Sequence, residues 1–381
     1  MKTNMKKLSF ILIAFLAGGF VMAQNISDTK QTGNSNELSV AQTGTNNLVG
    51  RIATESSLVT YSSQTGDENE ATVTQDGTGN KAFFEQGTTL RYPGTLPASG
   101  NKNEITIDQD GLSNIAWGYS IGNENIVKVT QEAVGNSATE SNQSGHWLWG
   151  NGNKAKMSQT AGKLNYAYVA ANSSGNSSTI NQIGTNNNGT TSQGWIGYSN
   201  MDGNTATINQ TGKDNMVSLP GTFVLAGYTP DLYGFGIQQY GMENEGTVNQ
   251  FADANNAAIW QFGNDNEGTI TQRSNLNTAY LIQLGDDNHA SIEQKTGTMN
   301  KVTLKQTDGV LEGGEANIVQ DGFGNVIKGL GLDEMATSFD GSYLKVDQIG
   351  NSNILNLQQT NGASAIVYQN GSANTSTVIQ N

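Results

Sequence analysis

The sequence has 381 residues, of which 47 are glycine and none is cysteine, and its formal net charge is −14 at pH 7. Charged residues make up 14% and hydrophobic residues 35%, which fits neither a charge-rich disordered chain nor a domain with a conventional apolar core. The acidic balance disfavours nucleic acid and anionic membrane surfaces as partners. The lack of cysteine excludes disulfides and thiolate metal sites.

The first 23 residues have the pattern of an export signal. A basic start with three lysines precedes an apolar stretch at 8–17, which is too short to span a bilayer. Ala23 supplies a small residue for cleavage, so the mature chain is expected to begin at Gln24 and to be secreted. No later segment is apolar enough to predict insertion into a membrane.

From Asn25 onward the chain repeats a unit of eleven residues, Asn-x5-Gln-x4. Asn is followed six residues later by Gln eighteen times, which is too often to result from composition alone. Internal periodicity of this kind predicts a repeat architecture. The most regular run supplies the candidate structural ladder: Asn244, Gln250, Asn255, Gln261, Asn266, Gln272, Asn277, Gln283, Asn288 and Gln294.

Each unit is predicted to form one strand and one turn. Along 266–272, alternate residues point to opposite faces of a strand, so that amide, small, β-branched and amide side chains share one face and Glu and Thr share the other. Glycine two residues after Gln, as at Gly263, supplies the positive φ that a tight arc needs. Two units would form one rung of an all-β β-solenoid, with about 16 rungs in which equivalent amides stack into hydrogen-bonded ladders.

A single solenoid domain is expected over 24–381, with the regular spacing interrupted by loops at its edge. These insertions hold the four prolines and several aromatic clusters. They are predicted near 48–60, 87–102, 144–152, 216–237 and 326–344.

The last unit occupies 374–380, and the first begins at Asn25. A solenoid that stays monomeric needs caps, because a bare terminal rung is an open strand edge. The expected terminal edge is the inward row of the last unit: Asn374, Ser376, Val378 and Gln380.

The unit resembles the curlin repeat of curli-type amyloid pili, whose pattern includes Gln-x-Gly-x-x-Asn-x5-Gln. The matching segments here are 64–75, 239–250 and 261–272. The resemblance implies a self-assembling structural subunit of an extracellular fibre or fimbrium, for biofilm matrix and cell adhesion. It also implies a homopolymer, a nucleator subunit at the cell surface, and secretion of the unfolded chain through an outer-membrane pore.

No catalytic, cofactor-binding or metal-binding site is expected. His289 is placed on an outward position and His146 in an aromatic insertion, without a ligand spacing between them. The carboxylates are scattered singly over outward positions, where a solubilising role is favoured over an acid–base pair. Asp-Gly pairs such as Asp76-Gly77 favour plain turns over calcium loops, since the nonapeptide pattern is missing.

One alternative function remains open from the sequence. The chain could be a monomeric secreted β-solenoid that acts as an adhesin, or that binds carbohydrate through Trp117, Trp147, Trp149 and Trp195, or ice through outward Thr rows. The outward rows are mixed, as at 301–305, which disfavours ice binding. Enzymatic activity is not expected.

Overall fold

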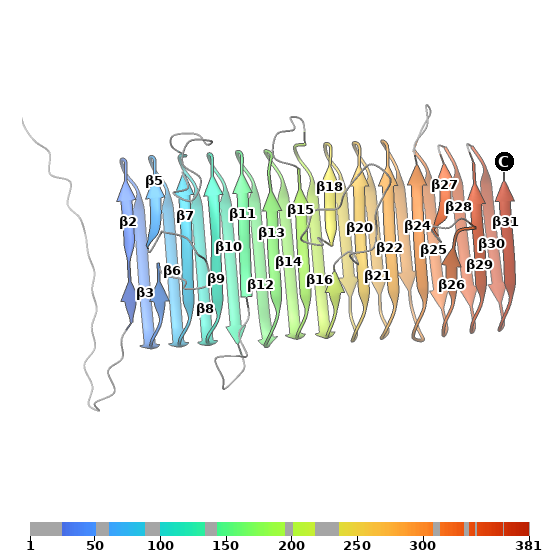
Figure 1. Cartoon of the computed structure of the whole chain (residues 1–381), viewed down its shortest axis with the longest axis horizontal. Coiled ribbons are helices and arrows are strands. Elements are labelled where there is room, and N and C mark those ends of the chain that lie inside the picture. The colour runs from blue at the N-terminus through green and yellow to red at the C-terminus, as the bar shows by residue number, and fades with distance from the viewer. Residues whose placement is uncertain are drawn as a thin grey trace, which may run out of the picture.

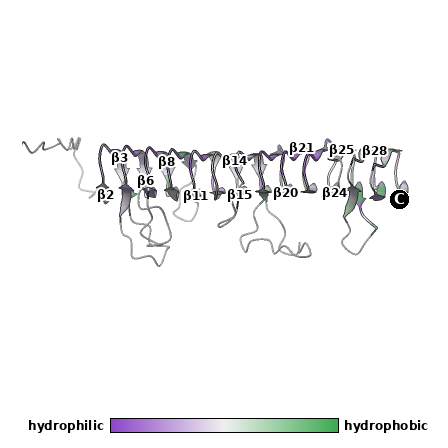
Figure 2. Cartoon of the chain, turned by 90° about the horizontal axis from the view of Figure 1, so that it is seen from above, coloured by the Kyte–Doolittle hydropathy of each residue, from purple (hydrophilic) through white to green (hydrophobic). Residues whose placement is uncertain are grey.

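The computed structural model describes residues 25–50, 61–87, 100–133, 143–194, 201–217, 236–307, 313–330, 335–339, 341–360 and 362–380. These residues form an all-β rod made of two β-sheets (Figure 1). Each sheet consists of parallel strands, and the two sheets face each other along the whole length of the rod. Figure 2 shows the two sheets as separate layers. The export signal predicted at 1–23 lies outside the described residues.

The first sheet, which we call sheet B, has thirteen strands and every row is a single unbroken strand. Its strands are β3 (Glu37–Thr45), β6 (Glu70–Thr78), β8 (Glu104–Leu112), β10 (Ile126–Ala133), β12 (Lys154–Gly162), β14 (Ser177–Thr185), β16 (Thr205–Lys213), β19 (Glu245–Gln250), β21 (Glu267–Gln272), β23 (His289–Gln294), β25 (Glu315–Asp321), β28 (Tyr343–Ile349) and β30 (Ser364–Asn370).

The opposite sheet, sheet A, has eighteen strands. Four of its rows consist of two short strands each, so the eighteen strands form fourteen rows. The divided rows are β1 (Ile26–Ser27) with β2 (Thr29–Thr32), β4 (Leu48–Val49) with β5 (Ser62–Thr65), β17 (Met216–Val217) with β18 (Ile237–Tyr240), and β26 (Val326–Lys328) with β27 (Ala336–Phe339). The other rows are β7 (Lys81–Gly87), β9 (Ile115–Ile121), β11 (Gln143–Trp149), β13 (Tyr166–Ala171), β15 (Asn188–Gln193), β20 (Asn256–Phe262), β22 (Thr278–Leu284), β24 (Lys301–Thr307), β29 (Ile354–Gln359) and β31 (Thr375–Gln380).

The chain alternates between the sheets, one row of sheet A and then one row of sheet B, so two consecutive rows make a rung. Rows pair in parallel with identical unit positions opposite each other, as in the series Gln250, Gln272 and Gln294. The β-solenoid prediction is therefore confirmed. In the described residues sheet B has thirteen rows and sheet A fourteen, fewer than the sixteen or so rungs expected.

A narrow apolar interior lies between the sheets. It is built from the third and fifth residues of each unit, counting its Asn position as the first and its Gln position as the seventh. In β20 these are Ala257 and Ile259, and in β21 they are Gly268 and Ile270. Ile259 and Ile270 are fully buried, and each such side chain contributes about 1.5–3 kcal/mol on burial. A Cβ on Gly268 would lie 2.8 Å from Leu281 Cδ2 of the facing sheet, so the interior leaves no room for a larger residue there.

The arcs between the sheets depend on glycines that stack rung upon rung. Gly263 has φ +117°, a conformation that other residues rarely adopt. A Cβ at Gly263 would lie 2.0 Å from the carbonyl oxygen of Gly285 in the next arc. Glycine is therefore needed at position 263 for two reasons, the positive φ that the sequence predicts and the close approach of successive backbones.

Gly263→Ala is expected to destabilise the solenoid by several kcal/mol, since both a strained φ and a backbone clash result. Gly152→Ala is the matched control, because Gly152 also has a positive φ, +66°, but a Cβ added there would meet nothing within 4 Å. That control is expected to cost about 1–2 kcal/mol. The measurement is the guanidinium midpoint of unfolding. Equal midpoints for the two variants would contradict the stacked-arc explanation.

Two of the predicted insertions are wrong at least in part. Residues 144–152 were expected to form a loop, but Gln143–Trp149 is strand β11, paired in register with β9 and β13. Within 326–344, strands β26 and β27 and the start of β28 belong to the sheets. Residues 51–60, 88–99 and 218–235, which form the bulk of the other three insertions, lie outside the described residues.

Candidate functional site: amide ladders and open ends

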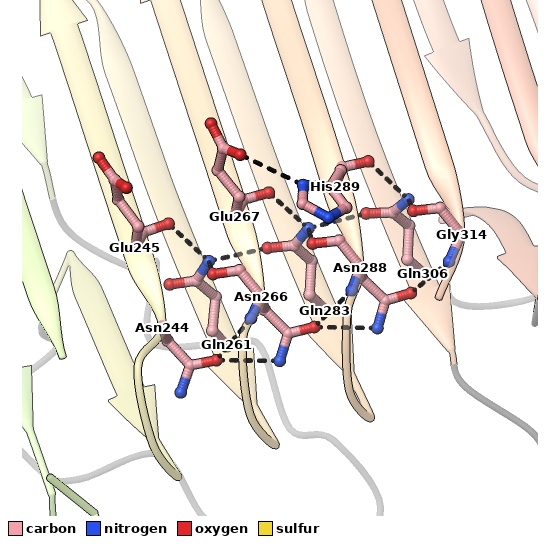
Figure 3. Close-up of polar contacts among 10 residues, drawn as sticks. All are labelled: Asn244, Glu245, Gln261, Asn266, Glu267, Gln283, Asn288, His289, Gln306 and Gly314. Carbon is pink, nitrogen blue, oxygen red and sulfur yellow. Dashed lines mark hydrogen bonds and ion pairs between the residues drawn. The ribbon is translucent and has the colours of Figure 1, made fainter. Parts of the chain in front are cut away.

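The glutamines that end the strands form a column along the inside of each sheet. Figure 3 shows part of the sheet A column. In sheet A, Gln261 Nε2 donates to Gln283 Oε1 at 2.9 Å, and Gln283 Nε2 donates to Gln306 Oε1 at 2.9 Å. The same Nε2 of Gln261 also donates to the backbone carbonyls of Glu245 and Asn266, at 2.8 and 2.9 Å. Gln261 and Gln283 therefore tie their own rungs to the next rung, and Gln261 also closes the arc between the two sheets.

The asparagines that open the strands form further columns with the opposite polarity. Asn244 Oδ1 accepts from the backbone N–H of Asn266 at 3.1 Å and from its Nδ2 at 2.9 Å. Asn288 repeats both contacts on Asn266. Asn266 Nδ2 also donates to the Gly285 carbonyl at 2.6 Å. Glutamine side chains thus donate toward the C-terminal end of the rod, whereas asparagine side chains accept from it.

The ten predicted ladder residues are all buried, and the structure distributes them over four columns instead of one. Sheet B carries Asn244, Asn266 and Asn288 before its strands and Gln250, Gln272 and Gln294 at their ends; sheet A carries Asn255 and Asn277 before its strands and Gln261 and Gln283 at their ends.

One column contains a stretch without amide side chains that sequence reasoning missed. In sheet A the column passes from Gln86 to Ser120, Leu148 and Ala171 before it returns to Gln193. These three residues are fully buried, as the glutamines are. This stretch lacks the Asn-to-Gln spacing, and for that reason the sequence predicts a loop where β11 lies. Trp147 and Trp149 were an available strand signal, since aromatic residues are enriched in strands.

His146 lies in β11, two residues before Leu148, and not in a loop. Its side chain is fully buried between the sheets, opposite Gly118 of the neighbouring row, and a Cβ on Gly118 would lie 2.3 Å from His146 Nδ1. Neither ring nitrogen has a hydrogen-bond partner within the described chain. Burial lowers the pKa of His146 from 6.5 to about 3. The imidazole therefore serves as a neutral packing group.

Acid is expected to destabilise the solenoid through His146. The unfolded chain gains a proton on this residue below pH 6.5, whereas the folded chain excludes it down to a pKa of about 3. Stability therefore falls as the pH drops through this window, by about 1.4 kcal/mol per pH unit. His146→Leu should reduce the difference between unfolding midpoints at pH 7 and pH 4.5, whereas His289→Gln at an exposed position should not. An unchanged difference in His146→Leu would contradict the buried placement.

The outward faces carry exposed charges at isolated positions. His289 Nδ1 lies 3.2 Å from Glu267 Oε2, with both side chains more than half exposed. Arg273 Nε lies 3.1 Å from Glu293 Oε1. Such exposed pairs contribute little to stability. Among the described residues no group of three or more His, Asp or Glu is placed to hold a metal ion.

Aromatic side chains gather on the outer face of sheet A. Tyr119 lies between Phe83 and Trp147, with ring centroids 5.9 and 5.5 Å apart, and is 5% exposed. Trp117 contacts Tyr168 at 5.6 Å. These rings pack against one another, and Trp117, Trp147 and Trp149 are half-buried. Of the tryptophans considered for carbohydrate stacking, Trp195 lies outside the described residues.

The N-terminal end of the rod presents unused amide groups. Gln31 and Gln42 donate to Gln64 and Gln75 of the next rung, at 2.7 and 2.8 Å. Within the described residues no donor reaches Oε1 of Gln31 or Gln42, and the backbone N–H of Asn36 has no asparagine acceptor below it. This end therefore offers glutamine acceptors and asparagine donors.

The opposite end presents the complementary groups. Gln380 Nε2 and Gln369 Nε2 have no further glutamine acceptor in the described chain and donate to Ser364 O at 2.8 Å and to Ile354 O at 2.9 Å. Asn374 binds Asn353 Oδ1 below it, at 2.9 Å, and its own Oδ1 receives no donor among the described residues. The expected edge residues Asn374, Ser376, Val378 and Gln380 lie on the inward row of β31, each half-buried where equivalent residues elsewhere are covered.

Comparison with known proteins agrees with the repeat. A model of the curlin associated repeat matches residues 33–77, 66–89, 241–272 and 263–295. These segments contain the described strands from β3 to β7 and from β19 to β23. The resemblance to the curlin repeat is thereby confirmed. No curated protein matches the chain. No helix among the described residues is long and apolar enough to cross a membrane.

Proposed function

We propose that this chain, which carries curlin associated repeats along a solenoid with two exposed strand edges, is a structural subunit of an extracellular curli-like amyloid fibre. The fibre grows by stacking the end rung of one copy on the end rung of another. It serves as an adhesive component of a biofilm matrix, and the chain performs no catalysis and needs no cofactor.

The complementarity of the two ends carries this proposal. Within the rod, Gln261 donates to Gln283 of the rung ahead, and Asn244 accepts from Asn266 of the rung ahead. At the two ends the equivalent groups lack partners among the described residues, and a second copy supplies both in one step. Gln31 is exposed and Gln42, Asn374 and Gln380 are half-buried in the single chain, and stacking would bury them. A buried amide without a partner costs about 1–3 kcal/mol, so the matching donors and acceptors let the rungs join without that penalty. Parallel in-register strands are also the arrangement of stable cross-β assemblies.

Two further partners belong to the proposal through the family. Export by residues 1–23 would be followed by passage of the unfolded chain through an outer-membrane pore, and a nucleator would present the first rung. The regular interior supports this route, since every rung can form on the rung before it.

Seeded assembly tests the proposal directly. The mature chain, 24–381, is expected to remain soluble through a lag phase, bind an amyloid dye as it assembles, and lose the lag when preformed fibre fragments are added. A chain that stays monomeric for days at micromolar concentration, with or without seeds, would favour the monomeric adhesin instead.

A further inference from the structure

The two sheets have unequal numbers of rows, and this determines how copies can stack if the chain forms the proposed fibre. In the described solenoid sheet A has fourteen rows and sheet B thirteen. The N-terminal end begins with the sheet A row β1/β2, and the C-terminal end finishes with the sheet A row β31, one half-rung beyond β30 of sheet B. The described rod therefore has fourteen plus thirteen rows, which is twenty-seven, an odd number.

A copy stacked without rotation leaves a vacant row. If β1/β2 of the next copy paired with β31 in sheet A, its β3 would lie two row spacings from β30 in sheet B. One strand would be missing there, and the edges of β30 and of the next β3 would both stay unpaired. If the next copy moved one row spacing closer, its β1/β2 row would overlap with β31 of the first copy.

Rotation by half a turn removes the vacancy. We propose that successive copies along the fibre are related by a half-turn about its axis, so that sheet A of one copy continues sheet B of the next. Strand β1/β2 of the next copy then pairs with β30, and its β3 pairs with β31. Since the strands of the two sheets run in opposite directions within a rung, the half-turn also keeps every new pair parallel.

The repeat unit is shared by both sheets, so the ladder positions remain in register across this junction. Gln31 of the next copy stacks on Gln369, and Gln42 of the next copy stacks on Gln380. Asn36 of the next copy stacks on Asn374, whose free Oδ1 accepts its N–H. Each contact joins a donor to an acceptor, whereas two like ends would oppose donors to donors. The fibre is therefore polar, with the C-terminal end of each copy against the N-terminal end of the next.

An outward contact distinguishes the half-turn from unrotated stacking. Tyr368 of β30 is 64% exposed, and Lys345 Nζ of the preceding row lies 5.7 Å from its ring centroid. Lys30 of the next copy holds the same sixth unit position as Tyr368 and would cover the ring from the other side. Without rotation, Lys30 would instead be placed on Ile379, which is 55% exposed and offers an ammonium group no favourable contact.

Cysteine pairs test the junction, because the chain has no cysteine of its own. Paired strands hold their Cα atoms about 4.8 Å apart, within the range of a disulfide. Ile379→Cys with Ala41→Cys, in one chain, tests the rotated junction, and Ile379→Cys with Lys30→Cys tests the unrotated one. All three positions are exposed and outward, and the two ends of one rod are too far apart for a bond within a copy (Figure 1).

Fibres of the first variant are expected to give a ladder of disulfide-linked multimers on a non-reducing gel, at least about tenfold more than fibres of the second. The reverse result would show unrotated stacking and overturn the proposal. Fibres in which neither pair forms would overturn end-to-end stacking in this register. If the unsubstituted chain forms no fibres at all, the proposed function itself fails, and the half-turn fails with it.

A label far from the junction provides a second measurement that does not disturb it. Ser291 lies on the exposed outer face of β23 in sheet B, and Ser291→Cys carries one gold particle per copy. The half-turn predicts particles on alternating sides of the fibre, about 65 Å apart along the axis at ~4.8 Å per rung. Particles confined to one side would contradict it.

Discussion

Replacing Gln261, Gln272 and Gln283 together with alanine is expected to abolish seeded elongation or slow it by at least about a hundredfold. Each glutamine is fully buried and donates to the next glutamine at 2.9 Å. Its removal also takes away a side-chain donor to backbone carbonyls such as Glu245 O. At about 1–3 kcal/mol for each buried polar group left unpaired, three sites are expected to cost several kcal/mol.

The matched control replaces Glu267, Thr269 and Thr271 with alanine on the same rungs. These side chains point outward and are exposed or half-buried, so their loss removes no interior contact. The control is expected to elongate within a fewfold of the parent chain. Both sets are measured by seeded dye-binding rates and by the guanidinium midpoint. Similar losses in both sets would mean that the inward ladders do not hold the rungs together.

Thr377→Pro is expected to block growth at the C-terminal end. In the preceding row, Ile354 N–H donates to Asn374 O at 2.8 Å, and Thr360 N–H donates to Gln380 O at 3.0 Å. Residues whose side chains face outward therefore direct their backbone N–H groups toward the next row. By the same alternation, Thr377 N–H of β31 points toward the incoming strand. Proline removes this donor and places its ring against that strand.

Thr377→Val is the control, because it keeps both the N–H group and the β-branched shape. We expect it to grow at about the parent rate, while Thr377→Pro reduces elongation from C-terminal ends by at least tenfold. The rest of the solenoid should still fold, since its rungs do not depend on β31. Parent-like elongation of Thr377→Pro would remove this edge from the mechanism.

The repeat spacing was sufficient to predict the fold because a closed amide ladder tolerates few residues. Asn266 and Gln272, for example, could be assigned to the interior from spacing alone, and both are buried. Where other residues fill the same positions, the signal disappears. Leu148 and Ala171 stand in a glutamine column, and the spacing predicts a loop for the strand that contains Leu148. Small or apolar residues pack there without needing a hydrogen-bond partner.

The direction of the ladders could not be obtained from the sequence. Glutamine and asparagine carry both donors and acceptors, so spacing alone does not say which end of the rod offers which group. The burial of His146 could not be predicted from the sequence either. Its ring fits because Gly118 of the neighbouring row has no side chain, and the sequence does not show that these two residues are neighbours. Nor does counting Asn-to-Gln spacings reveal that the sheets differ by one row.

Diffraction from aligned fibres of the mature chain tests most directly whether rungs stack along the fibre axis. The expected pattern is a sharp meridional reflection near 4.7–4.8 Å, from strands perpendicular to the axis, with a diffuse equatorial reflection near 10 Å from the two facing sheets. A pattern whose 4.7–4.8 Å reflection lies on the equator, or fibres that lack it, would contradict growth by rung stacking.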